Sequence, residues 1–143
     1  TTWAILEEKS NGSKMIFFNT QLDNEGKVAR DKSVHLILDK VKEIAPDMQA
    51  IITGDFNCTP DEAPFNTLEK GGMQNTSKTA SVTYGPTWSF HDFGRLPQNE
   101  RVLLDYIFVT KGAQVDRYRV IQDTPDNGFL SDHDPVLVSF NFR

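Results

Sequence analysis

The chain has 143 residues, of which 38% are hydrophobic and 24% charged; this fits one globular domain or a large part of one and excludes a disordered linker. Its net charge of −5 excludes the overall basic character that dominates nonspecific binding to nucleic acids. No apolar run approaches the roughly 20 residues of a membrane helix, and a single cysteine, Cys58, excludes an internal disulfide framework.

The first part of the chain predicts three strands and a long helix. Apolar runs at residues 3–6 and 15–18 flank a turn that contains glycine, which is typical of an antiparallel hairpin. Residues 27–45 predict a helix, because apolar side chains recur there at spacings of three and four, and Pro46 ends it. Residues 50–52 predict a strand. Since these strand runs do not alternate with polar residues, we expect helices on one face of the sheet and another apolar layer on the other.

The remaining part predicts a shorter helix, a long loop and three more strands. The helix covers residues 61–69, with Thr59 or Asp61 as its cap and two glycines as its stop. Residues 75–99 are rich in Thr, Ser, Gly and Pro and predict a long ordered loop, a kind of segment that often carries function. The other predicted elements are strands at 106–109, 113–122 and 136–142 and a turn at 125–128.

The first polar motif lies at the end of a predicted buried strand. Asp55 and Asn57 follow residues 50–52, at the sheet edge where open α/β sheets bind ligands. Side chains at alternate positions point the same way, so the pair would present one charged and one neutral oxygen. A turn in which Asp and Asn cap the next element is the alternative interpretation.

Two further motifs combine carboxylates with an imidazole. Asp105 lies inside an apolar strand, where a carboxylate is rare unless it is paired, either with a base such as Arg101 or with an imidazole that it orients. Asp132 can bind a hard cation, and His133 can take a proton from water if a carboxylate holds its other nitrogen. Polar surface is the alternative for this last pair. Together the motifs supply the cation ligand, base and orienting carboxylate of a hydrolytic site.

In this order and spacing the motifs resemble a known family. Gly54-Asp55-Phe56-Asn57, Leu104-Asp105-Tyr106-Ile107-Phe108 and Ser131-Asp132-His133-Asp134-Pro135-Val136 are similar to those of the endonuclease/exonuclease/phosphatase superfamily, the deoxyribonuclease I-like proteins. Residues 19–24 resemble the family motif Asn-Thr-His-Leu-Asp-His, and residues 86–90 resemble its Thr-Phe loop. The resemblance implies an α/β fold, a four-layer α/β/β/α sandwich, and hydrolysis of a phosphate ester by in-line attack of water with Mg²⁺ or Mn²⁺.

The resemblance also implies roles for individual residues. His133 would act as the general base or polarise the attacking water, and Asp105 would orient it. Asp132 would ligate the metal. Asp55 and Asn57 would hold the nucleophile or the leaving group near the metal, with Asp55 as a further metal ligand.

Asn19 and Gln21 would contact the substrate phosphate. Gln21 departs from the family pattern, because many members have His at this position. Glutamine donates a hydrogen bond but carries neither a proton nor a positive charge, so we expect weaker phosphate binding or a shifted substrate preference. Asn24 replaces the second His of the same motif.

The resemblance covers only the C-terminal half of the family domain, which runs to about 250 residues. We therefore interpret residues 1–143 as a single partial domain. The family's metal-binding Glu and a further Asn belong to the N-terminal half and have no counterpart here. We expect an exposed apolar sheet face that packs on that half or on a second copy of the chain, and low or absent activity of the chain alone.

The sequence thus predicts a metal-dependent phosphoesterase that favours phosphodiesters. The expected partner is a phosphate ester in a nucleic acid, a phosphoinositide or a phospholipid headgroup. The alternative is a non-catalytic fragment or binding module that keeps the fold with an incomplete metal site. We expect no transmembrane or uncleaved signal segment, and the sequence indicates no compartment.

Overall fold

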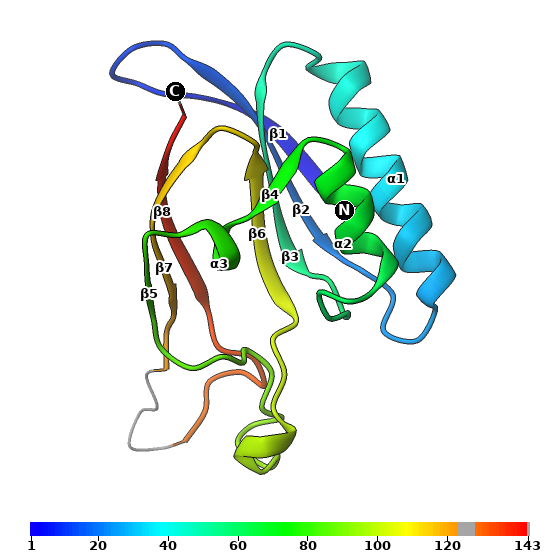
Figure 1. Ribbon diagram of the computed structural model, residues 1–143, viewed down its shortest axis with the longest axis vertical. Helices are drawn as coiled ribbons and strands as arrows, with labels where there is room; N and C mark the ends of the chain where they lie inside the picture. Colours follow the sequence, from blue (N-terminus) through cyan, green and yellow to red (C-terminus); the bar gives the residue numbers. More distant parts are fainter. Residues whose placement is uncertain (123–127, 143) are drawn as a thin grey trace.

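A computed structural model describes residues 1–122 and 128–142, which form two β-sheets and a layer of helices (Figure 1). A five-stranded sheet has the order β1-β2-β3-β6-β4, and a three-stranded sheet has the order β5-β7-β8. The elements are β1 (Thr2–Glu7), β2 (Lys14–Gln21), α1 (Lys27–Ile44), β3 (Gln49–Asp55), α2 (Ala63–Lys70), β4 (Met73–Asn75), α3 (Thr76–Thr79), β5 (Val82–Tyr84), the 3-10 turn η1 (Gln98–Glu100), β6 (Asp105–Thr110), β7 (Gln114–Val120) and β8 (Val136–Asn141).

The larger sheet is built around β3. β1 and β2 form the predicted antiparallel hairpin, and α1 carries the chain from β2 to the parallel neighbour β3. On its other side β3 pairs with β6 in antiparallel orientation, and β4 pairs with the outer edge of β6. Because β2 and β3 end where β6 begins, the polar residues at these three strand ends meet at one edge of the sheet.

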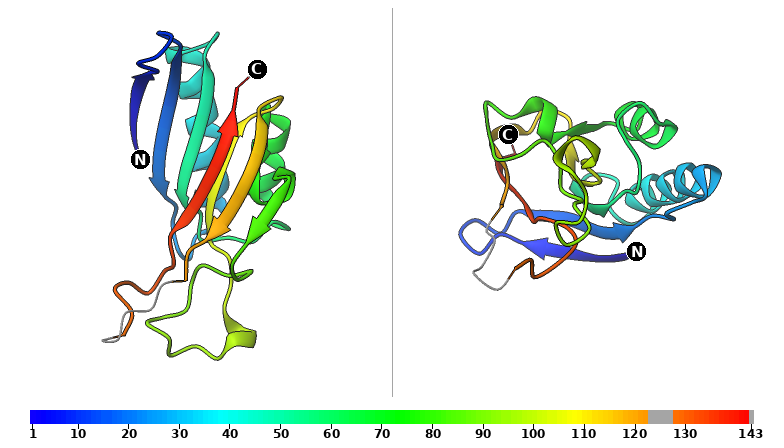
Figure 2. Two further views of the ribbon diagram at one scale, coloured as in Figure 1. Left: turned by 90° about the vertical axis from the view of Figure 1, so that its left-hand side faces the viewer. Right: turned by 90° about the horizontal axis from the view of Figure 1, so that it is seen from below.

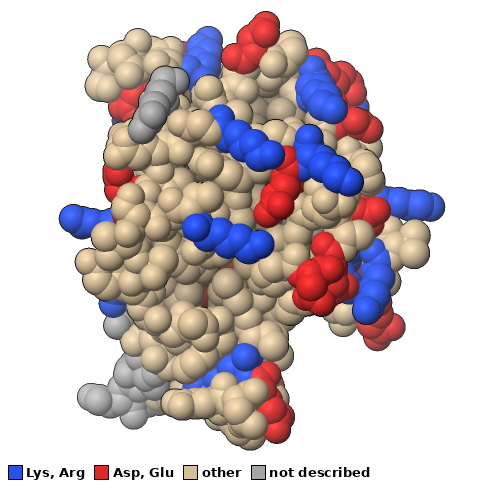
Figure 3. All heavy atoms as spheres, viewed as in Figure 1, with Lys and Arg blue, Asp and Glu red and all other residues tan. Residues whose placement is uncertain are grey.

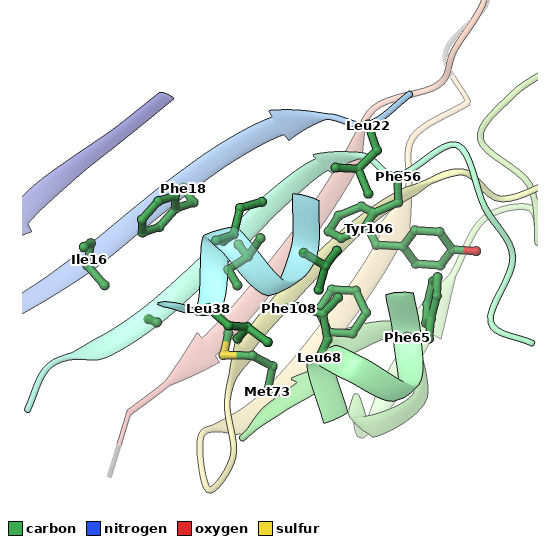
Figure 4. Packing of buried hydrophobic residues seen from close by; sticks show 14 of the residues in the cluster. Ile16, Phe18, Leu22, Leu38, Phe56, Phe65, Leu68, Met73, Tyr106 and Phe108 are labelled. Carbon is green, nitrogen blue, oxygen red and sulfur yellow. The ribbon is translucent and has the colours of Figure 1, made fainter. Parts of the chain in front are cut away.

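The helices α1 and α2 cover one face of the larger sheet. Alternate residues of β2, such as Ile16 and Phe18, point toward them and are buried. Beside α2, the rings of Phe65 and Tyr106 meet edge to face with centroids 4.7 Å apart, and Phe108 packs against both (Figure 4). None of the helices in the described part of the chain combines the length and apolar character needed to cross a bilayer.

The three-stranded sheet packs on the opposite face (Figure 2). Ile51 and Val109 of the larger sheet are buried against Val115 of β7, and Val138 and Phe140 of β8 pack at the edge of this cluster. The predicted inner sheet with an apolar layer on each side is therefore confirmed, as is the α/β sandwich. The prediction that this second face lies exposed is wrong for β3 and β6, because the chain itself supplies three strands that cover it.

Apolar surface remains exposed elsewhere. β1 is exposed along its whole length, including Trp3, Ile5 and Leu6. On the outer face of the three-stranded sheet, Tyr84 and Leu137 are exposed, and within the described residues no helix covers them (Figure 2). The fourth, helical layer of the predicted sandwich is therefore not formed by residues 1–122 and 128–142.

Two predicted elements differ from the structure. The shorter helix begins at Ala63, after Glu62 rather than Thr59 or Asp61. Here Glu62 accepts a hydrogen bond from the Thr59 amide at 3.3 Å, and its other oxygen pairs with Arg30 at 2.7 Å, so a distant contact fixes the start of the helix.

The predicted loop over residues 75–99 contains regular structure. The Asn75 side chain accepts a hydrogen bond from the Ser77 amide at 3.0 Å and starts α3. β5 then pairs with β7, more than thirty residues further along the chain, and no local pattern encodes such a pairing. Of the predicted turn at 125–128, residues 125–127 lie outside the described residues.

Gly54 is the place where β2 and β3 approach too closely for a side chain. Its φ is +144°, and a Cβ at this position would lie 1.8 Å from the Thr20 carbonyl oxygen. We expect Gly54→Ala to lower the free energy of unfolding by about 3 kcal/mol or more, since the two strands must separate. Urea denaturation followed by circular dichroism measures this loss.

Gly112→Ala is the matched control. Gly112 also has a positive φ, +96°, but nothing lies within 4 Å of its Cβ position. We expect a loss of about 1 kcal/mol from backbone strain alone. Equal losses in the two variants would contradict the close strand contact.

Candidate functional site

Three polar side chains lie at the ends of adjacent strands. In the ladder register Gln21 is opposite Asp55, and Asp55 is opposite Asp105. Ile51 and Val109, four residues away along β3 and β6, face the three-stranded sheet, and strand residues four apart share a face. The three polar side chains therefore project from the face between the two sheets, at its edge.

A tight turn links Asp55 to Asn57. One oxygen of Asp55 accepts a hydrogen bond from the Asn57 amide at 2.9 Å, and the other accepts one from Asn57 Nδ2 at 3.0 Å. Asn57 lies beyond the end of β3 with φ +47°, a conformation that Asn tolerates. Its side chain thus meets Asp55 through the turn and not through the strand alternation that the sequence predicts. The turn of the alternative interpretation is present, and a functional role for the pair stays a prediction.

The surroundings of Asp55 disfavour the ionised form of its carboxyl. Burial raises the pKa of its carboxyl above the ordinary value, and the charge of Asp105 adds to this effect. The Asn57 amide and His133 act in the opposite direction without cancelling it. A cation beside Asp55 would offset the cost of the two neighbouring carboxylates.

His133 and Asp105 form a close pair. The His133 Nδ1 atom lies 2.6 Å from Asp105 Oδ2, and both side chains are about one-quarter exposed. Arg101 is not the partner of Asp105, because its Nε donates to the Leu96 carbonyl at 3.0 Å and its guanidinium lies over the Trp88 ring. Of the two predicted partners for Asp105, the structure therefore has the imidazole, and the role of Asp105 in orienting it stays a prediction.

The surroundings of His133 raise the pKa of its imidazole. Burial acts to lower the pKa, but the hydrogen bond and charge of Asp105, together with the charges of Asp55 and Asp132, raise it above 6.5. The folded chain therefore holds this proton more tightly than the unfolded chain. His133 favours folding below pH 6.5, and this contribution is lost as the pH rises through the higher folded value.

An open cleft of about 640 Å³ lies in front of these groups. Four of the predicted site residues line it, namely Gln21, Asp55, Asn57 and His133. The rest of its wall consists of Leu22, Asp23, Asn24 and Phe90. The structure therefore brings together side chains from β2, from the end of β3 and from the loop before β8.

Asp105, Asn19 and Asp132 lie outside the wall of the cleft. Asp105 lies beside His133 as its partner. Asn19 is two residues before Gln21 on the same face of β2, and its side chain accepts a hydrogen bond from the Thr53 hydroxyl at 3.0 Å. Asp132 is half-buried, next to His133 in the chain, and acts on that imidazole through its charge.

The side-chain oxygens near the cleft are of the type that binds hard cations such as Mg²⁺. Asp55, Asn57 and Asp132 carry carboxylate and amide oxygens, and Mg²⁺ is commonly held by one or two carboxylates together with water molecules. Among the described residues, however, no group of three or more His, Cys, Asp or Glu side chains lies close enough to hold a metal ion. The described residues could therefore supply some of the ligands of a Mg²⁺ ion, but not a complete set.

Ser89 is a contact of Asp105 that no pattern in the sequence marks as a site residue. This fully buried residue lies in the chain between β5 and β6, and its hydroxyl donates to Asp105 Oδ2 at 2.6 Å. Its only sequence signal is its place within residues 86–90, the segment that resembles the Thr-Phe loop. A serine among turn-forming residues has no periodicity that would reveal burial.

Comparison with known proteins extends these observations. Residues 16–133 match the model of the Endonuclease/Exonuclease/phosphatase family. A solved endonuclease/exonuclease/phosphatase from Bacteroides vulgatus is 32% identical, with a TM-score of 0.89 over 99% of this chain and 54% of that one. A mannosyl-6-phosphatase from Bacteroides thetaiotaomicron is 31% identical, with a TM-score of 0.86 over 98% of this chain and 56% of that one.

A more distant solved structure shares the fold. A variant of beta toxin from Staphylococcus aureus, solved with bound magnesium ions, is 19% identical, with a TM-score of 0.70 over 99% of this chain and 57% of that one. The chain thus spans little more than half the length of the solved structures that it matches.

The contact with Asp105 predicts how His133 titrates. In Asp105→Asn we expect the pKa of His133 to fall below its wild-type value, because the largest effect that raises it is removed while burial remains. The C2 proton of the imidazole, followed by NMR against pH, reports this change.

Asp116→Asn is the control for the loss of one carboxylate. Asp116 lies on β7, bonded to Gln114 and Asn141 and away from His133. We expect this substitution to leave the His133 titration unchanged. An unchanged titration in Asp105→Asn as well would contradict the pairing.

Proposed function

The chain belongs to the endonuclease/exonuclease/phosphatase family, whose model matches residues 16–133, and from this premise we propose that it hydrolyses phosphate esters with a water molecule activated by His133. The observation that carries the proposal is the 2.6 Å contact between His133 and Asp105 at a cleft that Asp55 and Asn57 also line. An imidazole held in this way, beside acidic oxygen donors, is the arrangement that water activation needs.

The proton transfer follows from the geometry of the imidazole. With Nδ1 bonded to Asp105, His133 Nε2 is the nitrogen left to take a proton from water. As that proton moves to Nε2, the water oxygen bonds to phosphorus and the ester bond to the leaving oxygen breaks. The leaving oxygen then takes a proton from solvent. Asp105 stabilises the imidazolium that forms.

Mg²⁺ or Mn²⁺ is the proposed cofactor. Asp132 and Asp55 would hold it, and Asn57 supplies a neutral oxygen nearby. Such an ion offsets charge on the phosphoryl oxygens and lowers the pKa of bound water. The raised pKa of Asp55 supports a cation at this end of the cleft, and the beta toxin that shares the fold contains magnesium ions.

Asn19 and Gln21 are the proposed phosphate contacts. Gln21 lies in the wall of the cleft, beside Asp55 with which it hydrogen-bonds, and would donate a neutral hydrogen bond to phosphate. Asn19 accepts a hydrogen bond from Thr53. We propose phosphodiesters as the favoured substrates, in nucleic acids, phosphoinositides or phospholipid headgroups. Acidic and basic side chains are interspersed on the face in Figure 3, and the net charge of −5 disfavours long duplex DNA. Because the chain is similar to a mannosyl-6-phosphatase, sugar phosphate monoesters are the first substrates to compare with phosphodiesters.

The exposed apolar surfaces are the proposed contacts for a second layer. They comprise Trp3, Ile5 and Leu6 on β1 and Tyr84 and Leu137 on the three-stranded sheet. We propose that the N-terminal half of the family domain or a second copy of the chain covers them. The mass of the chain in solution, measured by light scattering, distinguishes a dimer from a monomer.

A binding module without catalysis is the second candidate function. It is favoured by Gln21 in place of the family's His and by the lack, among the described residues, of three clustered groups that could hold a metal. A protein of this kind would bind phosphate esters and leave them intact.

His133→Ala tests the hydrolytic proposal. We expect the rate of hydrolysis of bis-p-nitrophenyl phosphate by the full encoded protein to fall about 10²- to 10⁴-fold, because the general base is lost. The release of p-nitrophenol measures the rate. His35→Ala is the control, since His35 lies exposed on α1 and its loss should leave the rate unchanged.

Equal activity in wild type and His133→Ala would exclude His133 as the base. The protein could also hydrolyse neither the diester nor a panel of phosphate monoesters and still bind inorganic phosphate. That result would favour the binding module.

Metal removal tests the cofactor. We expect dialysis against EDTA to abolish hydrolysis and added Mg²⁺ or Mn²⁺ to restore it, since no Lys or Arg side chain is among the described residues that line the cleft. Asp132→Asn should weaken Mg²⁺ binding in isothermal titration, whereas Asp116→Asn should not. Full activity after chelation would exclude a metal-dependent mechanism.

A further inference from the structure

Ser89 connects the two segments that carry the His133–Asp105 pair. Its amide donates to the Val102 carbonyl at 3.0 Å, in the stretch leading into β6. Its carbonyl accepts from the amide of Asp134 at 2.7 Å, the residue directly after His133. The backbone of this one residue therefore ties the start of β6 to the loop that presents the imidazole.

The hydroxyl of Ser89 has a defined direction. Its Oγ accepts hydrogen bonds from the amides of Leu104 and Asp105, each at 3.1 Å. Since two N–H donors point at the oxygen, the hydroxyl's own proton goes to its third close neighbour, Asp105 Oδ2 at 2.6 Å. This bond has the length of a charge-assisted hydrogen bond to a carboxylate.

The same carboxylate oxygen serves both partners. Asp105 Oδ2 lies 2.6 Å from the Ser89 hydroxyl and 2.6 Å from His133 Nδ1. Two donors converging on one oxygen fix the rotation of the carboxylate, and the carboxylate in turn fixes the imidazole. Ser89 is fully buried, so water does not compete for this bond.

We propose that Ser89 is a positioning residue of the hydrolytic site, which holds Asp105 so that His133 presents its Nε2 atom to the cleft. This inference rests on the proposed function, and it adds a residue that touches neither the cleft nor the reacting atoms. Phe90 completes the arrangement, because it forms a β-bridge with His133 and packs against its ring at 4.9 Å.

Ser89→Ala tests the inference with two readouts. In the metal-free protein, we expect the low-field NMR signal of the His133 Nδ1 proton to shift or broaden, because the carboxylate is free to rotate. In the active protein, we expect kcat to fall about 10- to 100-fold, the usual effect of losing a partner behind a catalytic group, with KM within about twofold. Ser89→Thr keeps the hydroxyl and should retain the signal.

Thr76→Val is the matched control. Thr76 is also fully buried, and its hydroxyl donates at 2.7 Å to the Ile107 carbonyl on the same strand, β6. The substitution Thr76→Val removes this buried hydrogen bond without affecting a contact of Asp105. We therefore expect lower stability but an unchanged His133 signal and kcat. If Ser89→Ala behaves like Thr76→Val in all three measurements, the positioning role is wrong.

A measurement on the unaltered protein keeps the test decisive if Ser89→Ala does not fold. The Ser89 hydroxyl proton and the His133 Nδ1 proton point at one oxygen, so a nuclear Overhauser effect should connect them. Its absence, with both signals assigned, would overturn the inference. If the wild type shows this effect but hydrolyses no phosphate ester, the positioning network stands and the proposed function fails.

Discussion

The pairing of β3 on both sides determines where the polar groups at the strand ends of the larger sheet lie. β2 runs parallel to β3 and β6 antiparallel, so the C-terminal ends of two strands and the N-terminal end of a third meet at one level. A slip of one residue would turn Asp55 and Asp105 to opposite faces. Gly54 allows this register, because its lack of a side chain lets β3 approach the Thr20 carbonyl. The acidic edge is thus a consequence of strand register.

Apolar packing on both faces of the sheet holds that register. On one face the rings of Phe56, Phe65, Tyr106 and Phe108 form a continuous cluster under α1 and α2 (Figure 4). On the other face Ile51 and Val109 pack against the three-stranded sheet. Such rings each bury about 150–250 Å² and resist displacement. Polar side chains at the strand ends therefore project from a rigid support, which is what pre-organised chemistry requires.

The sequence predicts the parts of this arrangement that local patterns encode. The hairpin, α1 and the strands around residues 51 and 108 follow from apolar runs and helical periodicity, and Asp55, Asp105 and His133 stand out as polar groups at strand ends. Ser89 and the pairing of β5 with β7 could not be predicted, because both depend on contacts between distant segments. Asn19 comes from the family resemblance, whereas Asp132 stands out beside His133 in the sequence itself. The roles of both remain predictions, and neither residue lines the cleft.

The carboxylates of the site act on one another and on His133 through their charges. Three carboxylates, Asp55, Asp105 and Asp132, act on the single imidazole of His133, and their combined charge raises its pKa although burial opposes this. The same crowding, with burial as the larger cause, raises the pKa of Asp55. A cation at the cleft, as proposed above, would offset the negative charge that these carboxylates place beside a phosphate ester. The acidic edge that raises the pKa of His133 is therefore also the feature that supports the proposed metal ion.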